Sequence, residues 1–222
     1  MSDSPQAGFD AREQRNANPD RLLAFTDGVF AIIITILVLE LKVPDLTSGQ
    51  SLREALVEIR PTFVSFIISF LLVGMYWVGH RSSFTQVRYI DRNTIWLNLL
   101  FLLPVAIVPF AAGLLGEYQS EPTALHLYGL VLIAATLLRL ALDSYIYRHP
   151  GLLWQEPSKG VRRVARIATG APLVAYAIAM IVATWVPWLS LLLYFSIPLF
   201  YFVFVTVLKA DPRTRVDAED LS

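Results

Sequence analysis

The sequence predicts an all-α, polytopic membrane protein with six transmembrane helices per subunit and both termini in the cytoplasm. Hydrophobic residues make up 55% of its 222 residues and charged residues only 16%, whereas about 25% are charged in ordinary globular proteins. Six stretches are long and apolar enough to cross a bilayer as a helix, which takes about 20 residues. Most of the 18 Lys and Arg residues fall in segments that share one side of such a bundle, and that side is expected to be cytoplasmic.

The six spans are expected, in chain order, at about residues 21–41, 61–79, 94–115, 123–147, 161–185 and 188–208. The first follows an Asn-Pro pair, and Asp20 is expected to be its N-cap. Ser51 and Glu54 have the spacing of a capping box, so the second helix is expected to begin outside the bilayer and to bend at Pro61. The last two spans are separated only by a tight turn at Val186-Pro187.

Acidic residues gather in the segments that are expected on the outer side. These segments carry only three basic residues, Lys42, Arg53 and Arg60. They carry six carboxylates, at Glu40, Asp45, Glu54, Glu58, Glu117 and Glu121. Such a rim would raise the local cation concentration through its field; the alternative is that these are ordinary solvated loop carboxylates.

The composition also excludes several classes of protein. The 18 basic and 18 acidic residues cancel, so no nucleic-acid partner is expected. The chain has no Cys, which removes disulfides, thiolate metal sites and cysteine catalysis. No phosphate loop, nucleophile elbow or zinc-protease motif occurs, so no enzyme activity, cofactor or bound metal is expected.

We expect polar cytoplasmic segments at 1–20 and 210–222 and one six-span domain at 21–209, embedded in the lipid bilayer of the inner (plasma) membrane.

One carboxylate stands inside the first span. Asp27 is the only charged residue between Arg21 and Glu40. A charge at the centre of a membrane helix costs roughly 2.5–3.5 kcal/mol on insertion scales, and less near a helix end. Asp27 is therefore expected to have a hydrogen-bonding partner or to face water.

A stripe of residues follows one face of the same helix. At about 100° per residue, Gly28, Ile32, Thr35 and Leu39 fall within an arc of roughly 60°, a spacing typical of helices that pack around an axis. Asp27 lies about 100° from Gly28, so it is expected to tie the helix to its neighbours. Ordinary helix packing is the alternative explanation of the stripe.

Three stretches carry a resemblance to a known family. Arg-x-x-x-Phe-Thr-Asp-Gly at 21–28 resembles the Arg-x-x-x-Phe-Ser-Asp-Gly signature of the prokaryotic relatives of the lysosomal potassium channel, transmembrane protein 175. The stretch at 76–80 is similar to the Trp-x-x-His element of the family, and those at 97–100 and 108–110 resemble the start and end of its third span. The chain departs from the signature at Thr26, where the family usually has Ser, but the hydroxyl is kept.

This resemblance implies a potassium-permeable cation channel that assembles as a homotetramer, with its pore lined by the first span of each subunit. In the family, bulky apolar side chains of that helix form a constriction with a Thr nearby. These positions correspond to Ile32, Thr35 and Leu39 here, and Ile36 flanks them. The carbonyl filter of conventional potassium channels does not occur in the sequence. The expected partners are other copies of the chain, lipid, and permeant potassium or other monovalent cations.

The resemblance also implies a packing and hydrogen-bond network that holds the first helix. Its expected members are Arg21, Phe25, Thr26, Asp27, Gly28, Trp77, His80 and Asn98. For His80, a structural role is one interpretation. Proton sensing is the other, because the unperturbed pKa of histidine is near 6.5.

A secondary transporter is the alternative function. Arg139 and Asp143 are four residues apart in the fourth span, so they are expected to pair on one helix face. In a transporter, this pair and Asp27 would couple ion movement to solute movement.

Overall fold

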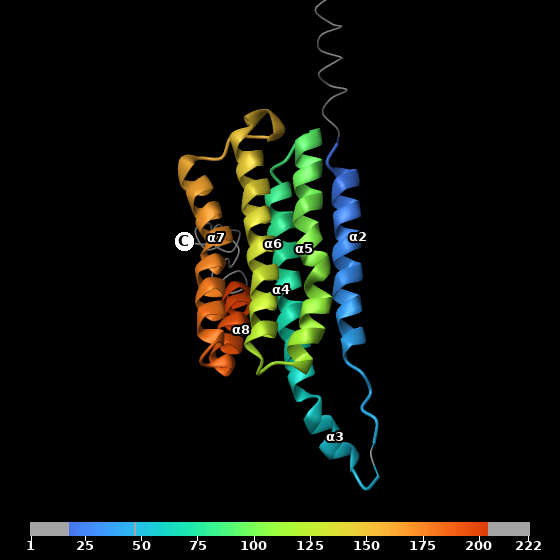
Figure 1. The fold of residues 1–222 in the computed structure, drawn as a ribbon. Helices are drawn as coiled ribbons and strands as arrows, with labels where there is room; N and C mark the ends of the chain where they lie inside the picture. Colours follow the sequence, from blue (N-terminus) through green and yellow to red (C-terminus); the bar gives the residue numbers. More distant parts are fainter. Residues whose placement is uncertain (1–17, 47, 204–222) are drawn as a thin grey trace, which may run out of the picture.

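The computed structural model describes residues 18–46 and 48–203. Within these ranges the chain forms seven α-helices (Figure 1): α2 (Asp20–Ile36), α3 (Leu52–Glu58), α4 (Arg60–Phe84), α5 (Arg92–Glu117), α6 (Pro122–Arg148), α7 (Lys159–Ala183) and α8 (Pro187–Val203). Two short 3-10 helices are also present: η1 (Leu37–Glu40), which continues α2, and η2 (Pro150–Leu152), which follows α6.

Five helical segments are long and apolar enough to cross a membrane: Asp20–Glu40, Arg60–Phe84, Arg92–Glu117, Pro122–Arg148 and Lys159–Ala183. They coincide with the first five predicted spans, so the prediction of an all-helical, polytopic membrane protein is confirmed. A shorter apolar helix, Pro187–Tyr201, lies where the sixth span is predicted. The predicted end of that span at 208 lies outside the described residues, as do the tail at 210–222 and nearly all of the segment at 1–20.

The first helix does not begin as predicted. Asp20 is the first residue of α2, and the cap position is Pro19, whose backbone is already helical and which makes no side-chain cap bond. The side chain of Asn18 accepts the backbone N–H of Asp20 instead, at 3.0 Å. The predicted Asp20 cap is therefore wrong, because the helix already includes Asp20, whose own N–H is bonded to the Asn18 side chain.

The capping box before the second span is confirmed. The Ser51 hydroxyl accepts the Glu54 backbone N–H at 3.3 Å, and the Glu54 carboxylate accepts the Ser51 backbone N–H at 2.8 Å. The predicted bend at Pro61 is instead a break between α3 and α4 at Ile59. A break forms because the ring of Pro61 would clash with the carbonyl of Val57 in a continuous helix, whereas proline is tolerated in a first turn.

The helices pack as a bundle with two exposed edges. α2 contacts α4 and α5 at one edge, and α7 and α8 contact α6 and α4 at the other (Figure 1). Phe101, Tyr128 and Tyr176 are among the largest buried side chains of the core. Of the most apolar part of each span, 56% is buried in α5 but only 28% in α2 and 11% in α7. The edge helices α2 and α7 therefore turn most of their surface outward.

Gly129 on α6 allows α8 to approach closely. A Cβ atom at this position would collide with the Tyr194 hydroxyl and with Met180 of α7. The Tyr194 hydroxyl donates to the carbonyl of Leu125 at 3.0 Å. Small residues at helix contacts allow such approach in membrane bundles, and this contact fixes α8 against α6.

Candidate functional site

The predicted stripe, which runs along α2 and its continuation η1, lies on the face that turns away from the bundle. Ile32 is 59% exposed and Leu39 71% exposed, and Ile36, at the side of the stripe, is 40% exposed. Gly28 and Thr35 are exposed as well. In the part of the chain that the structure describes, no helix covers this face. It is available for contact with lipid, water or another copy of the chain.

The opposite face of α2 is held against the bundle. Phe30, Ile33 and Leu37 are buried, and α2 contacts α4 and α5 on this side. The ring centre of Phe30 lies 6.2 Å from that of Phe101 and 6.3 Å from that of His80. These contacts fix the rotation of α2 about its own axis, and with it the direction in which the stripe points.

Thr35 is the one hydroxyl on the exposed stripe. It donates to the backbone carbonyls of Ala31 at 3.0 Å and of Ile32 at 2.8 Å. A hydroxyl has one proton but two lone pairs. Its proton is therefore directed into the helix, while its oxygen keeps the capacity to accept a hydrogen bond or to contact a cation.

A chain of hydrogen bonds behind α2 joins three helices. The Asn98 amide of α5 donates to the Thr26 hydroxyl of α2 at 2.9 Å, and its carbonyl oxygen lies 2.8 Å from Nε2 of His80 on α4. All three side chains are fully buried. Because an amide oxygen only accepts, Nε2 of His80 carries the proton. Nδ1 of His80 has no hydrogen-bond partner among the described residues.

A second bond ties α2 to α4 nearby. The indole N–H of Trp77 donates to the Asp27 carboxylate at 2.8 Å, and the Arg81 guanidinium lies 5.8 Å from the centre of the Trp77 ring. Asp27 thus has a partner inside the bundle. Arg21 and Phe25 are exposed, and within the described ranges neither forms a hydrogen bond or ring contact with this network. Their assigned role stays a prediction.

The predicted pair on α6 is present and buried. Nε of Arg139 lies 3.1 Å from both carboxylate oxygens of Asp143, and the two residues are only 4% and 7% exposed. Arg139 also donates to the Gly79 carbonyl at 2.6 Å and to the Ser83 hydroxyl at 2.7 Å. The sequence spacing indicated the pair but not these bonds, which attach α6 to α4.

Phe101 separates the two buried polar groups. Its ring stacks 5.9 Å from that of His80, and the Arg139 guanidinium lies 5.7 Å from its centre. In the described part of the chain, no hydrogen bond or ion pair joins Asp27 to Arg139 or Asp143. The three charges that a transporter would use are therefore not brought into one cluster.

Asp91 forms a further polar contact, just before α5. Its carboxylate accepts the backbone N–H of Thr94 at 2.8 Å, the Thr94 hydroxyl at 2.6 Å and the Tyr145 hydroxyl of α6 at 2.5 Å. Burial acts to raise the pKa of Asp91, but these hydrogen bonds outweigh it and hold the pKa below the ordinary value. Neither here nor at any other place among the described residues do three His, Asp or Glu side chains gather in a way that could hold a metal ion.

The chain is similar in sequence and in fold to known membrane channels. The family described as the endosomal/lysosomal potassium channel TMEM175 matches residues 21–109. A potassium channel of Streptomyces collinus is 38% identical over 151 residues, covering 66% of this chain and 73% of that protein. A potassium channel of a Chryseobacterium species is 32% identical over 184 residues, covering 82% and 92%. The crystal structure of a lysosomal potassium-selective channel TMEM175 homolog from Chamaesiphon minutus is 28% identical, with a TM-score of 0.71 over 85% of this chain and 98% of that chain.

The fold and the site define a polytopic helical membrane protein in which an edge helix is hydrogen-bonded on one face and uncovered on the other. Two potassium channels above 30% identity match it over most of their own length. The chain belongs to the TMEM175 family. This is a family of ion channels and not of enzymes.

Proposed function

We propose that this chain is one subunit of a homotetrameric, potassium-permeable cation channel of the inner (plasma) membrane. It has six spans, both termini in the cytoplasm and a channel domain at residues 21–209. The observation that carries the proposal is the uncovered apolar stripe of α2, held in position by buried bonds on the opposite face. Such a face is suited to line an axis shared by identical subunits. The similarity to proteins named potassium channels supports the choice of ion.

The gate is hydrophobic and is formed by Ile32. Four Ile32 side chains around an axis leave a path too narrow and too apolar to stay wet. An ion in this path loses hydration that aliphatic carbon cannot replace, so desolvation sets the barrier. Leu39, about two turns further along, and Ile36, at the side, extend the apolar wall. A modest dilation lets water return and opens the path.

Thr35 adds the one polar group to this wall. Because its proton is directed toward the backbone carbonyls of Ala31 and Ile32, its oxygen lone pairs are available to a passing cation. Four such oxygens close to the Ile32 ring replace part of the lost hydration of a monovalent cation. Thr35 therefore tunes cation preference, while Ile32 controls passage.

Flux measurements on purified protein in liposomes test the proposal. With a potassium gradient across the membrane, we expect passive flux that follows the gradient and needs no second solute. Strict coupling of potassium to another solute would instead support a secondary transporter that uses Asp27, Arg139 and Asp143. The absence of potassium flux from folded protein would reject the channel.

Cross-linking tests the arrangement of subunits separately. The chain has no Cys, so Ile32→Cys introduces the only thiol. We expect oxidation to join copies of this variant, because the Ile32 side chains converge on one axis. The matched control is Val174→Cys, at the exposed face of α7, where no bridge is expected. Equal bridging in both variants would contradict a pore lined by α2.

A further inference from the structure

The short helix α3 projects beyond the end of the bundle (Figure 1). It lies outside the candidate membrane spans, yet its apolar side chains are exposed: Leu52 by 57%, Leu56 by 49% and Val57 by 42%. Inside a bilayer such exposure needs no explanation, because lipid is as apolar as leucine. Outside it, exposed apolar side chains that lie together indicate a surface that contacts something else.

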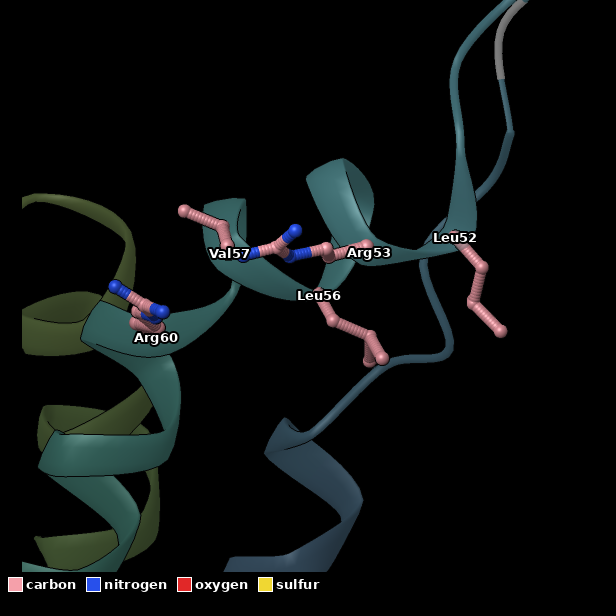
Figure 2. Close-up of a pocket in the computed structure, with 5 residues that line it drawn as sticks. All are labelled: Leu52, Arg53, Leu56, Val57 and Arg60. Carbon is pink, nitrogen blue, oxygen red and sulfur yellow. The ribbon is translucent and has the colours of Figure 1, made fainter.

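Two arginines complete this surface. Together with the three apolar side chains, Arg53 and Arg60 line a pocket of about 370 Å³ (Figure 2). Figure 2 shows the Arg53 side chain extending toward Val57, on the side of α3 that leads to Arg60. No carboxylate lines this basic pocket, and within the described ranges neither arginine forms a salt bridge. The surface is thus apolar and positively charged.

An acidic pocket lies at the same end of the bundle. It has a volume of about 520 Å³ and lies between the α3–α4 junction and the turn that joins α5 to α6. Glu58, Glu117 and Glu121 contribute carboxylates to its lining, which includes no Lys or Arg. Ile59 and Tyr118 give the same lining apolar area. Each subunit therefore carries two neighbouring surfaces of opposite charge, both with apolar components.

We infer that the basic pocket of one subunit docks onto the acidic pocket of a second copy of this chain. The inference rests on the proposed assembly of identical subunits. Both pockets lie at the end of the bundle where α3, the start of α4 and the end of α5 meet. In a ring of copies related by rotation about an axis along the bundle, these pockets lie at one level, and a head-to-tail contact between them closes the ring.

The charges and the apolar groups have separate roles in this contact. Opposite potentials select the orientation and exclude a basic pocket facing another basic pocket. Burial of Leu52, Leu56 and Val57 supplies an attraction that helices inside the membrane lack, because these side chains are removed from water rather than from lipid. The contact therefore stabilises the assembly without touching the pore-lining face of α2.

Thiol cross-linking tests the pairing. Arg53→Cys and Glu121→Cys are combined in the Cys-free chain, and a short bismaleimide is used because an Arg–Glu pair exceeds the reach of a disulfide, roughly 7 Å between Cα atoms. We expect inter-chain products about tenfold above those of either single-Cys variant, since docking holds the thiols at a high effective concentration. The control is Arg53→Cys with Arg81→Cys, where the second thiol lies at the other end of α4.

Two results overturn the inference. Equal products from Arg53→Cys alone mean that α3 packs on another α3. The absence of products from folded protein means that the pockets do not meet. In that second case, loss of copurified anionic phospholipid from Arg53→Glu/Arg60→Glu would show that the basic pocket binds lipid instead. Bridging of the separate Ile32→Cys variant, prepared in parallel, shows that the subunits assemble, so failure of the inference is distinguishable from failure of the channel proposal.

Charge reversal provides the second measurement. Arg53→Glu/Arg60→Glu is expected to lower the fraction of assembled protein that survives dilution in detergent. Adding Glu117→Arg/Glu121→Arg to the same chain is expected to restore it, because the pockets exchange their charges. Restoration supports docking between copies; a fourfold variant that recovers no assembled protein overturns it.

Discussion

The two edges of the bundle, α2 and α7, resemble each other at first sight. Both are apolar helices with most of their surface exposed. Only 28% of the most apolar part of α2 is buried, and only 11% of that of α7. Their exposed faces differ in chemistry. The large exposed hydrophobic side chains of α7 are all aliphatic: Val161, Val164, Ile167, Val174, Ile178 and Ile181. The start of α7 also exposes Lys159, Arg163 and Arg166. The face of α2 has a glycine and a threonine between its bulky residues, at Gly28 and Thr35.

The larger difference lies behind the two faces. The buried side of α2 is fixed by the hydrogen bonds from Asn98 to Thr26 and from Trp77 to Asp27. The fully buried residues of α7 are Tyr176, Ala179 and Ala183. Its hydrogen bonds to α6, from Thr169 to Asp143 and between His126 and the Met180 carbonyl, are only partly buried. Exposure alone therefore does not identify a pore-lining helix, since lipid accepts either face. What distinguishes α2 is the fully buried side-chain hydrogen bond from Asn98 to Thr26 behind its exposed face.

The largest expected effect is on the side of the bundle that carries α7. Arg139→Met leaves Asp143 buried without its cation, which destabilises proteins by about 3–5 kcal/mol. Unfolding by denaturant in detergent measures this loss. Arg139→Met/Asp143→Leu removes both charges and is expected to recover most of the stability. An Arg139→Met variant as stable as the wild type would show that Arg139 does not hold α6 against α4.

The next effect is on the network behind α2. Asn98→Leu removes the partner of both Thr26 and His80, and unsatisfied buried groups cost about 1–3 kcal/mol each. We expect lower unfolding stability and altered potassium flux together, because this network sets the rotation of α2. Asn93→Ala is the matched control: Asn93 is exposed and bonds only to Tyr145 among the described residues. An equal loss of unfolding stability in both variants would show that the buried Asn98 bonds contribute no more than the exposed Asn93 bond.

Much of this arrangement could be predicted from the sequence. Span positions follow from apolar runs, and the Ser51–Glu54 capping box follows from local spacing, so both were predictable. The exposed direction of Ile32 agrees with the helical periodicity of α2.

Other features depend on how helices pack, which spacing does not contain. The bonds from Arg139 to Gly79 and Ser83 require a particular register of α6 on α4. The basic pocket at Arg53 and Arg60 depends on the break at Ile59, where the sequence indicated a bend at Pro61. Local sequence patterns therefore predicted the helices, whereas these contacts between helices had to come from the structure.

A smaller effect is expected from polar substitutions on the exposed faces of α2 and α7. Ile32→Asn places a polar group on the face of α2 and should raise potassium flux at least about tenfold, which corresponds to about 1.4 kcal/mol of barrier. Val174→Asn makes the same kind of change on α7, where Val174 is 65% exposed, and should leave flux unchanged. Potassium flux through both variants is measured in liposomes with matched protein amounts. A response to both substitutions would show that the faces are equivalent.

The smallest expected effect concerns Asp91, which bonds only to α5 and α6 residues in the described part of the chain. Its pKa is lowered in the folded protein, so its contribution to stability is complete above its unfolded pKa, about 3.9, and is lost as the pH falls through the lower folded value. The Tm of the wild type should therefore fall more between about pH 5 and pH 3 than that of Asp91→Asn. Asp45→Asn, in the exposed segment before α3, serves as the control and should behave as the wild type. Because Asp91 bonds to neither edge helix, Asp91→Asn should leave potassium flux unchanged at neutral pH. A change in flux would show that passage also depends on contacts between α5 and α6.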